Sequence, residues 1–129
     1  MVRTADQGEL AFQDWFVRLR CGPVVQSVRF AGVETASPHP ALANFSTARG
    51  VIVCPSNPFV SVAPILALPG VRAALAAAKC PRIAVTPIVG GQAIKGPAAK
   101  MLAELGHEAS CGVFAPDVAR LEAVLTSDN

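Results

Sequence analysis

Two loops contain the residues of this chain that are best suited to bind or convert a ligand. The first is Cys54-Pro55-Ser56-Asn57-Pro58, and the second runs from Thr86 to Pro97. Each loop follows a short apolar run that predicts a buried strand. Because open α/β sheets bind ligands beyond the carboxyl ends of their parallel strands, we expect the two loops to meet at one site.

The first loop presents polar side chains on a stiff backbone. Pro55 cannot pair in a sheet and Pro58 keeps Asn57 extended, so Ser56 and Asn57 leave the strand on a rigid turn. A hydroxyl and a carboxamide in this setting orient a phosphate or the edge of a base. The alternative for the same residues is a turn that caps the following helix.

The second loop is suited to an anion. Gly90 and Gly91 permit a close approach of the backbone that a Cβ atom would block, and Lys95 adds a mobile positive charge before Gly96-Pro97 introduces a helix. The order of Lys95 and Gly96 differs from that of a Walker loop, which disfavours magnesium triphosphate chemistry. We predict a phosphate ligand; the alternatives are a plain turn at Gly90-Gly91 and a solvated Lys95.

The composition is that of one globular domain with little charge. Hydrophobic residues make up 52% of the 129, charged residues 16%, and the net charge is +2. With no basic run, nucleic acid is not expected as a partner, and with no uninterrupted apolar stretch of about 18 residues, neither is a membrane. The cysteines are dispersed without metal-ligand spacing, so we expect reduced thiols, no metal site and a cytoplasmic location. No residue pattern identifies a catalytic group.

The hydrophobic periodicity predicts a single α/β domain of three layers with a short, mostly parallel sheet. Residues 1–50 should form a peripheral helix, strand and loop, residues 51–112 a βαβα core, and residues 113–129 a terminal helix. The expected strands are Val24–Ala31, Val51–Cys54 (central and covered on both faces) and Arg82–Thr86, and the expected helices are Glu9–Arg20, Ala41–Ala48, Leu68–Lys79, Pro97–Leu105 and Ala115–Leu125.

The two loops and their surroundings resemble a known enzyme family. The segments that carry the resemblance are Val53–Pro58, Ser61, Pro64–Ala67, Pro69-Gly70, Pro87–Gly91 and Lys95–Lys100. They are similar to the carboxyl half of the 2-phospho-L-lactate transferase family of coenzyme F420 biosynthesis, a resemblance that extends from Val2 to Gly112. It implies a Rossmann-like fold and transfer of a phospholactyl or phosphoenolpyruvyl group from a guanosine diphosphate ester to a deazariboflavin acceptor, with Mg²⁺ and release of GMP.

The resemblance also assigns roles to the loop residues. Ser56, Asn57 and Pro58 would orient the guanosine ester, while Gly90, Gly91, Lys95 and Gly96 would hold its diphosphate. The catalytic groups stay unassigned, and the resemblance implies that the Mg²⁺ ligands and the acceptor site lie in an amino-terminal portion outside this chain, because the Gly-Gly-Thr-Gly turn of the family is not found in it; the family's final acidic strand is not found either. We therefore interpret the chain as a fragment of such a transferase, inactive alone. The alternatives are a non-catalytic nucleotide- or phosphate-binding remnant, and a structural subunit that needs a partner or forms a homo-oligomer.

Overall fold

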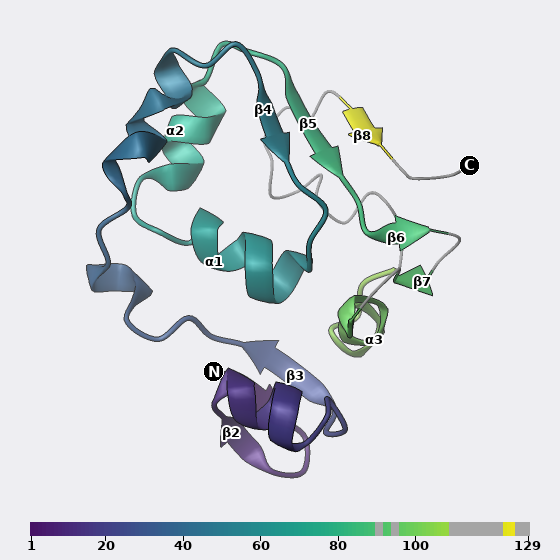
Figure 1. Cartoon of the computed structure of the whole chain (residues 1–129). Coiled ribbons are helices and arrows are strands. Elements are labelled where there is room, and N and C mark those ends of the chain that lie inside the picture. Colours follow the sequence, from purple (N-terminus) through teal and green to yellow (C-terminus); the bar gives the residue numbers. More distant parts are fainter. Residues whose placement is uncertain (90–91, 94–95, 109–122, 126–129) are drawn as a thin grey trace.

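The computed structural model describes residues 1–89, 92–93, 96–108 and 123–125. These residues form an antiparallel sheet, a parallel sheet and a short hairpin, with helices packed beside them (Figure 1). The strands are β1 (Val2–Thr4), β2 (Gly8–Leu10), β3 (Val25–Val28), β4 (Val51–Val53), β5 (Arg82–Val85), β6 (Ile88–Val89), β7 (Gln92–Ala93) and β8 (Ala123–Leu125). The helices are the π-helical turns η1 (Asp14–Arg18) and η4 (Pro58–Val62), the 3-10 helices η2 (Val33–Thr35) and η3 (Pro40–Ser46), and α1 (Ala63–Leu66), α2 (Val71–Ala77) and α3 (Ala98–Glu104).

Strands β4, β5 and β8 form a parallel sheet; the sequence predicts β4 and β5 as its strands, whereas a helix was expected where β8 lies. β5 lies in the middle and pairs in parallel with both neighbours, with Ile83 opposite Ile52 on one side and Ala123 on the other. Together with α1 and α2, which connect β4 to β5, this sheet confirms a partial α/β domain with a short parallel sheet. The carboxyl ends of β4 and β5 lead into the two loops of interest.

Helices α1 and α2 lie on one side of β4 (Figure 1). Val51 and Val53 of β4 pack with the buried side chains of these helices, whereas Ile52 is 66% exposed. Successive side chains of a strand point to opposite faces, so only one face of β4 meets helices. β4 is also at the edge of the described sheet. The expectation of a central strand covered on both faces is therefore wrong within the described residues.

Arg82 at the start of β5 has a structural role that the sequence did not reveal. Its side chain is buried, and Nη1 donates to the carbonyl oxygens of Leu75 at 3.0 Å and Ala78 at 3.1 Å. The last carbonyls of a helix have no partners within it. Arg82 thus supplies a charged cap for the carboxyl end of α2 from the neighbouring strand.

The first residues form a hairpin instead of leading into a long helix. β1 and β2 pair antiparallel with Val2 opposite Leu10, and β3 pairs on the other side of β1. The helix expected over Glu9–Arg20 is correspondingly short, since η1 covers only Asp14–Arg18. The pairing of β1 with β2 satisfies the backbone of residues 8–10, which outweighs their helical spacing.

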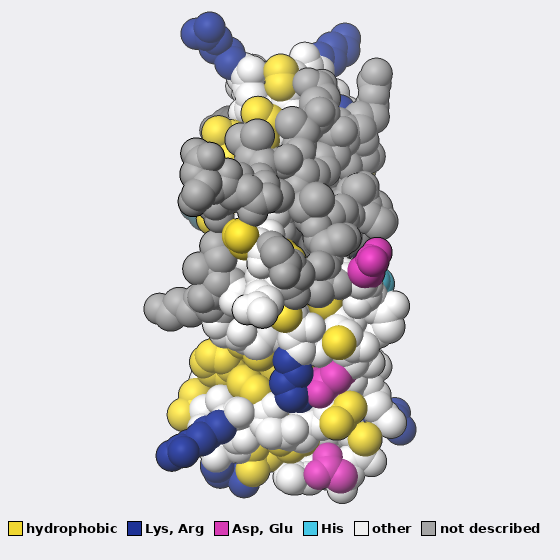
Figure 2. All heavy atoms as spheres, turned by 90° about the vertical axis from the view of Figure 1, so that its right-hand side faces the viewer, with side chains coloured by type: hydrophobic (Ala, Val, Ile, Leu, Met, Phe, Trp, Pro, Cys, Tyr) yellow, Lys and Arg dark blue, Asp and Glu magenta, His cyan; other side chains and the backbone are white. Residues whose placement is uncertain are grey.

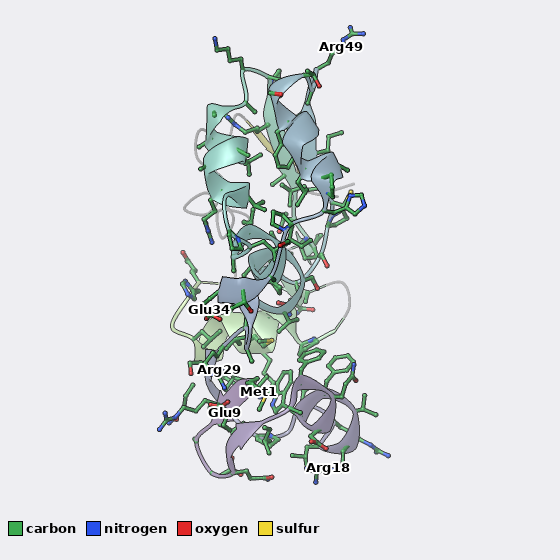
Figure 3. The ribbon with its side chains drawn as sticks, turned by 90° about the vertical axis from the view of Figure 1, so that its left-hand side faces the viewer. Met1, Glu9, Arg18, Arg29, Glu34 and Arg49 are labelled. Carbon is green, nitrogen blue, oxygen red and sulfur yellow. The ribbon has the colours of Figure 1, made fainter. Side chains whose placement is uncertain are left out.

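Hydrogen bonds of the Thr4 side chain stabilise the turn of this hairpin. The Thr4 hydroxyl donates to the Gly8 carbonyl at 2.9 Å and accepts from the Gln7 amide at 3.2 Å. Gly8 has φ of 68°, which favours glycine. Next to the hairpin, Arg29 pairs with Glu9, and Figure 3 shows the two side chains together near Met1.

The end of the chain also differs from expectation. A helix was expected over Ala115–Leu125; residues 109–122 lie outside the described residues, and Ala123–Leu125 form β8. An apolar segment gains more from pairing with the central strand β5 than from its modest helix propensity. A strand therefore occupies residues 123–125, where the sequence predicted the end of a helix.

One face of the molecule shows how the described basic side chains are distributed (Figure 2). On the face shown in Figure 2 the described Lys and Arg side chains are scattered from top to bottom. Within the described residues no single helix is long and apolar enough to span a membrane. The helices Pro58–Leu66 and Val71–Ala77 are together long and apolar enough, but they meet at a bend of 82°.

Candidate functional site

The described parts of both loops line one cavity. Its volume is about 530 Å³, which is in the range of small-molecule sites. We call it the loop cavity. Its lining comes from the first loop, from the second loop, from η4 and α3, and from the aromatic segment before and within η1: Phe12, Phe16, Pro55, Ser56, Asn57, Val60, Ser61, Pro87, Gly96, Pro97 and Ala98.

Asn57 lies in this lining and also caps η4. Its Oδ1 accepts from the amides of Phe59 at 2.9 Å and Val60 at 3.2 Å, and Pro58 is the buried first residue of that helix. The capping alternative for this loop is therefore observed. The Asn57 amide nitrogen lies 3.5 Å from the sulfur of Met101 on α3. Sulfur is a weak acceptor, so this nitrogen remains able to donate to a ligand.

The second loop is described only at its two ends. Near its start the Thr86 hydroxyl, which is buried, accepts from the amide of Ile88 at 3.1 Å. β6 and β7 pair with Val89 opposite Gln92. Gly96 has φ of 75° and lines the loop cavity. The other predicted residues of this loop, Gly90, Gly91 and Lys95, lie outside the described residues, so their phosphate contacts stay a prediction.

Two aromatic residues in the lining were missed by the sequence analysis. Phe12 and Phe16 were assigned only to the helix expected over Glu9–Arg20, yet their rings stack with centroids 5.2 Å apart and planes at 16° beside the first loop. Their spacing of four residues places both rings on the same side of one helical turn, which was the available signal. The cavity therefore combines an aromatic wall with polar loop residues.

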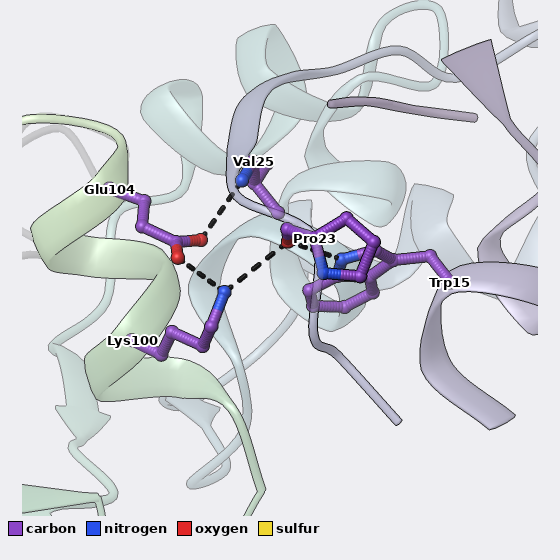
Figure 4. A network of polar contacts seen from close by, with 5 residues as sticks. All are labelled: Trp15, Pro23, Val25, Lys100 and Glu104. Carbon is purple, nitrogen blue, oxygen red and sulfur yellow. Dashed lines mark hydrogen bonds and ion pairs between the residues drawn. The ribbon is translucent and has the colours of Figure 1, made fainter. Parts of the chain in front are cut away.

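A polar network fixes the amino-terminal sheet to α3 (Figure 4). Lys100 Nζ and Trp15 Nε1 both donate to the Pro23 carbonyl, at 3.3 Å and 3.0 Å. Glu104 pairs with Lys100 and accepts from the Val25 amide at 3.0 Å. The network therefore joins the segment that carries Phe12, Trp15 and Phe16 to α3, and both parts contribute residues to the loop cavity.

The thiols near the site differ in exposure. Cys54 is exposed and Cys80 buried. Burial raises the pKa of the Cys21 thiol; the nearby Glu104 carboxylate adds to this effect and the Lys100 ammonium opposes it. A raised pKa keeps Cys21 protonated and unreactive at neutral pH. No group of three or more metal-ligating side chains occurs in the part of the chain that the structure describes.

Comparison with known proteins identifies one family and several named relatives. The family described as 2-phospho-L-lactate transferase CofD matches residues 1–129. The chain is similar to three phosphoenolpyruvate transferases: one from Kitasatospora aureofaciens is 40% identical over 115 residues, 87% of this chain and 36% of the relative. One from Mycobacterium avium (strain 104) is 41% identical over 100 residues, 77% of this chain and 30% of the relative. One from Mycobacterium marinum is 42% identical over 101 residues, 78% of this chain and 31% of the relative.

The chain thus spans about a third of the length of these curated relatives. The resemblance to a carboxyl half had implied about half. The family match also extends past Gly112 to the end of the chain.

Proposed function

Because this chain belongs to the 2-phospho-L-lactate transferase family, we propose that its loop cavity binds the donor in the transfer of a phospholactyl or phosphoenolpyruvyl group. The donor is a guanosine diphosphate ester and the acceptor a deazariboflavin, in the biosynthesis of coenzyme F420. The observation that supports this proposal is that the loops following β4 and β5 line one cavity of suitable size. We place the protein in the cytoplasm, where the three free thiols of the described residues stay reduced.

The residues of this chain act by positioning and charge. The Asn57 amide nitrogen and the Ser56 hydroxyl orient the ester, Gly90 and Gly91 let the backbone approach the diphosphate, and Lys95 neutralises part of its charge. Asn57 suits this role because η4 fixes its side chain through two amide bonds. No nucleophile from the protein is required.

The transfer itself is a substitution at phosphorus. The acceptor hydroxyl oxygen forms a bond to the phosphorus of the transferred group, the bond from that phosphorus to the bridging oxygen breaks, and GMP leaves with the bridging oxygen. The hydroxyl proton passes to water or to a base outside this chain. Mg²⁺ would reduce the charge of the diphosphate. The described residues contain no group of three or more metal-ligating side chains, and we propose that its ligands come from outside this chain.

The first experiment is a calorimetric titration of the chain with GDP in the presence of Mg²⁺. We expect saturable binding that Asn57→Asp and Lys95→Ala each weaken about tenfold, a change worth about 1.4 kcal/mol. Asn57→Asp keeps an acceptor for the amides of η4 but brings a negative charge next to the diphosphate. Lys95→Ala removes a positive charge.

Two variants control for effects on folding. Lys79→Ala removes an exposed lysine at the end of α2, away from the loop cavity, and should leave GDP affinity unchanged. Asn57→Ala removes the cap and should lower the free energy of unfolding by about 1 kcal/mol, which Asn57→Asp should not do. A folded wild-type chain that takes up no GDP would refute the donor site.

A second candidate, a subunit completed by the rest of the transferase domain, is favoured by the exposed face of β4. Ile52 is 66% and Ile65 53% exposed, and both line an apolar groove of about 310 Å³ beside β4. Within the described sheet β4 pairs only with β5, so one edge is open to a further strand. The relatives carry about two thirds of their length outside the matched segment, and we propose that a strand from that remainder adds to β4.

If a further strand adds to β4, it should protect Cys54 from alkylation, because this exposed thiol directly follows β4. Co-expression with the remaining part of the Kitasatospora aureofaciens relative should slow alkylation of Cys54 at least tenfold and yield a stable complex in sizing chromatography. Ile52→Glu should abolish both effects, because a charge on that face opposes burial. Val24→Glu, at the exposed residue that precedes β3, serves as the matched control. Equal loss of the complex in both variants, or no slowing of Cys54 alkylation, would contradict the idea.

A further inference from the structure

Phe12 and Phe16 form one wall of the loop cavity, and the loop residues of the proposed function leave this wall without a role. Phe16 is 40% exposed, which is a large exposed surface for an aromatic ring. It stacks on Phe12 and lines the same cavity as Ser56 and Asn57. A ring in this position offers its surface to a ligand in the cavity.

The wall is held in place by buried contacts. The Phe12 ring lies 6.2 Å from the ring of Trp15, centroid to centroid, and Trp15 has no exposed surface. Trp15 donates to the Pro23 carbonyl, which also receives the Lys100 ammonium of α3 (Figure 4). A ring that is already immobilised loses little conformational freedom when a ligand stacks on it.

The remaining lining suits a planar ring with a polar edge. Ser56, Asn57 and Ser61 supply the polar side chains, and most of the other lining residues are apolar. Aromatic side chains bind conjugated rings by offset or tilted stacking, and a few hydrogen bonds at the ring edge add specificity. A phosphate alone would make no use of the aromatic wall.

We propose that Phe12 and Phe16 form the wall of a subsite for a planar heteroaromatic ring, with Phe16 packed against the face of that ring. The identity of the ring rests on the proposed function, which offers two sources: the guanine of the donor and the deazaflavin of the acceptor. Both are conjugated rings with polar edges. The ring whose binding affinity falls when Phe16 is replaced is the one that occupies the subsite, so the affinities of the two rings are measured separately.

The test uses ligands without phosphate, so that only the ring is measured. Guanosine and deazariboflavin are titrated separately into the full chain, and inorganic pyrophosphate is titrated as a third ligand. Trp15, the only tryptophan, reports ring binding through its fluorescence because Phe12 lies beside it. Calorimetry gives the Kd for pyrophosphate.

The variants separate the aromatic ring from general packing. Phe16→Leu should weaken the binding of guanosine or of deazariboflavin about tenfold. Phe16→Tyr keeps an aromatic face, so its affinity for that ligand should stay within twofold of wild type. Val17→Ala, at a neighbouring residue that is 61% exposed and does not line the cavity, is the matched control. Pyrophosphate affinity should not change in any of them.

Each outcome decides between the two proposals. If pyrophosphate binds but Phe16→Leu changes the affinity for neither guanosine nor deazariboflavin, the aromatic subsite is wrong and the donor site stands. If a ring depends on Phe16 but pyrophosphate does not bind, the subsite stands and the phosphate role of the second loop fails. If the folded wild-type chain binds none of the three ligands, both proposals are overturned.

Discussion

Replacing Trp15 with alanine should lower the free energy of unfolding by about 3–5 kcal/mol. The indole is fully buried among Val2, Val25 and Met101, where it joins the amino-terminal sheet to α3. Its removal leaves a void in this cluster and takes one of two donors from the Pro23 carbonyl. Urea denaturation followed by circular dichroism measures the change without the lost fluorophore.

Trp15→Phe separates packing from the hydrogen bond. Phenylalanine fills most of the indole volume but has no donor for Pro23, so the loss should be about 1–2 kcal/mol. Val24, which precedes β3 and is 49% exposed, provides a control, since Val24→Ala should change the free energy of unfolding by less than about 0.5 kcal/mol. A loss below about 1 kcal/mol for Trp15→Ala would mean that this cluster does not hold the two parts together.

The parallel core could be predicted because its signals are local. Val51–Val53 and Arg82–Val85 are short apolar or β-branched runs, each followed by proline-rich turns, and the Ala-rich segment between them forms α2. Gly106, which follows the C-cap residue Leu105 of α3, has φ of 77°. These features depend on neighbouring residues, so sequence alone identifies them.

The amino-terminal part could not be predicted because its partners are distant in sequence. The spacing of Leu10, Phe12, Trp15 and Phe16 fits a helix, but Val2 and Leu10 are brought together by strand pairing that no local pattern reveals. Val2 and Thr4 are buried and Arg3 between them is exposed, which is the alternation typical of a strand. A segment of three residues is too short for this alternation to identify a strand from sequence alone.

The same limitation applies to the site. Ser56 and Asn57 were found because prolines mark their loop, whereas the aromatic wall arises only when η1 packs against that loop. Arg82 is a second residue whose role depends on another element. The sequence assigned it no partner, but its buried guanidinium caps α2. Contacts between elements, and not residue types, decide these roles.

Replacing Met101 with alanine should affect both stability and the site. Met101 has no exposed surface, and its removal from the cluster with Trp15 and Val25 should lower the free energy of unfolding by about 2–5 kcal/mol. Its sulfur also lies 3.5 Å from the Asn57 amide nitrogen, so the void reaches the back of the first loop. We expect GDP affinity to fall about fivefold, because Asn57 loses support on one side.

Met101→Leu distinguishes the two consequences. Leucine conserves the volume, so the free energy of unfolding should fall by less than about 1.5 kcal/mol. It removes the sulfur acceptor, but since a thioether is a weak partner, GDP affinity should remain within twofold of wild type. If Met101→Leu lowers the affinity for GDP as much as Met101→Ala does, the sulfur contact itself, and not the packing of α3, orients Asn57 in the loop cavity.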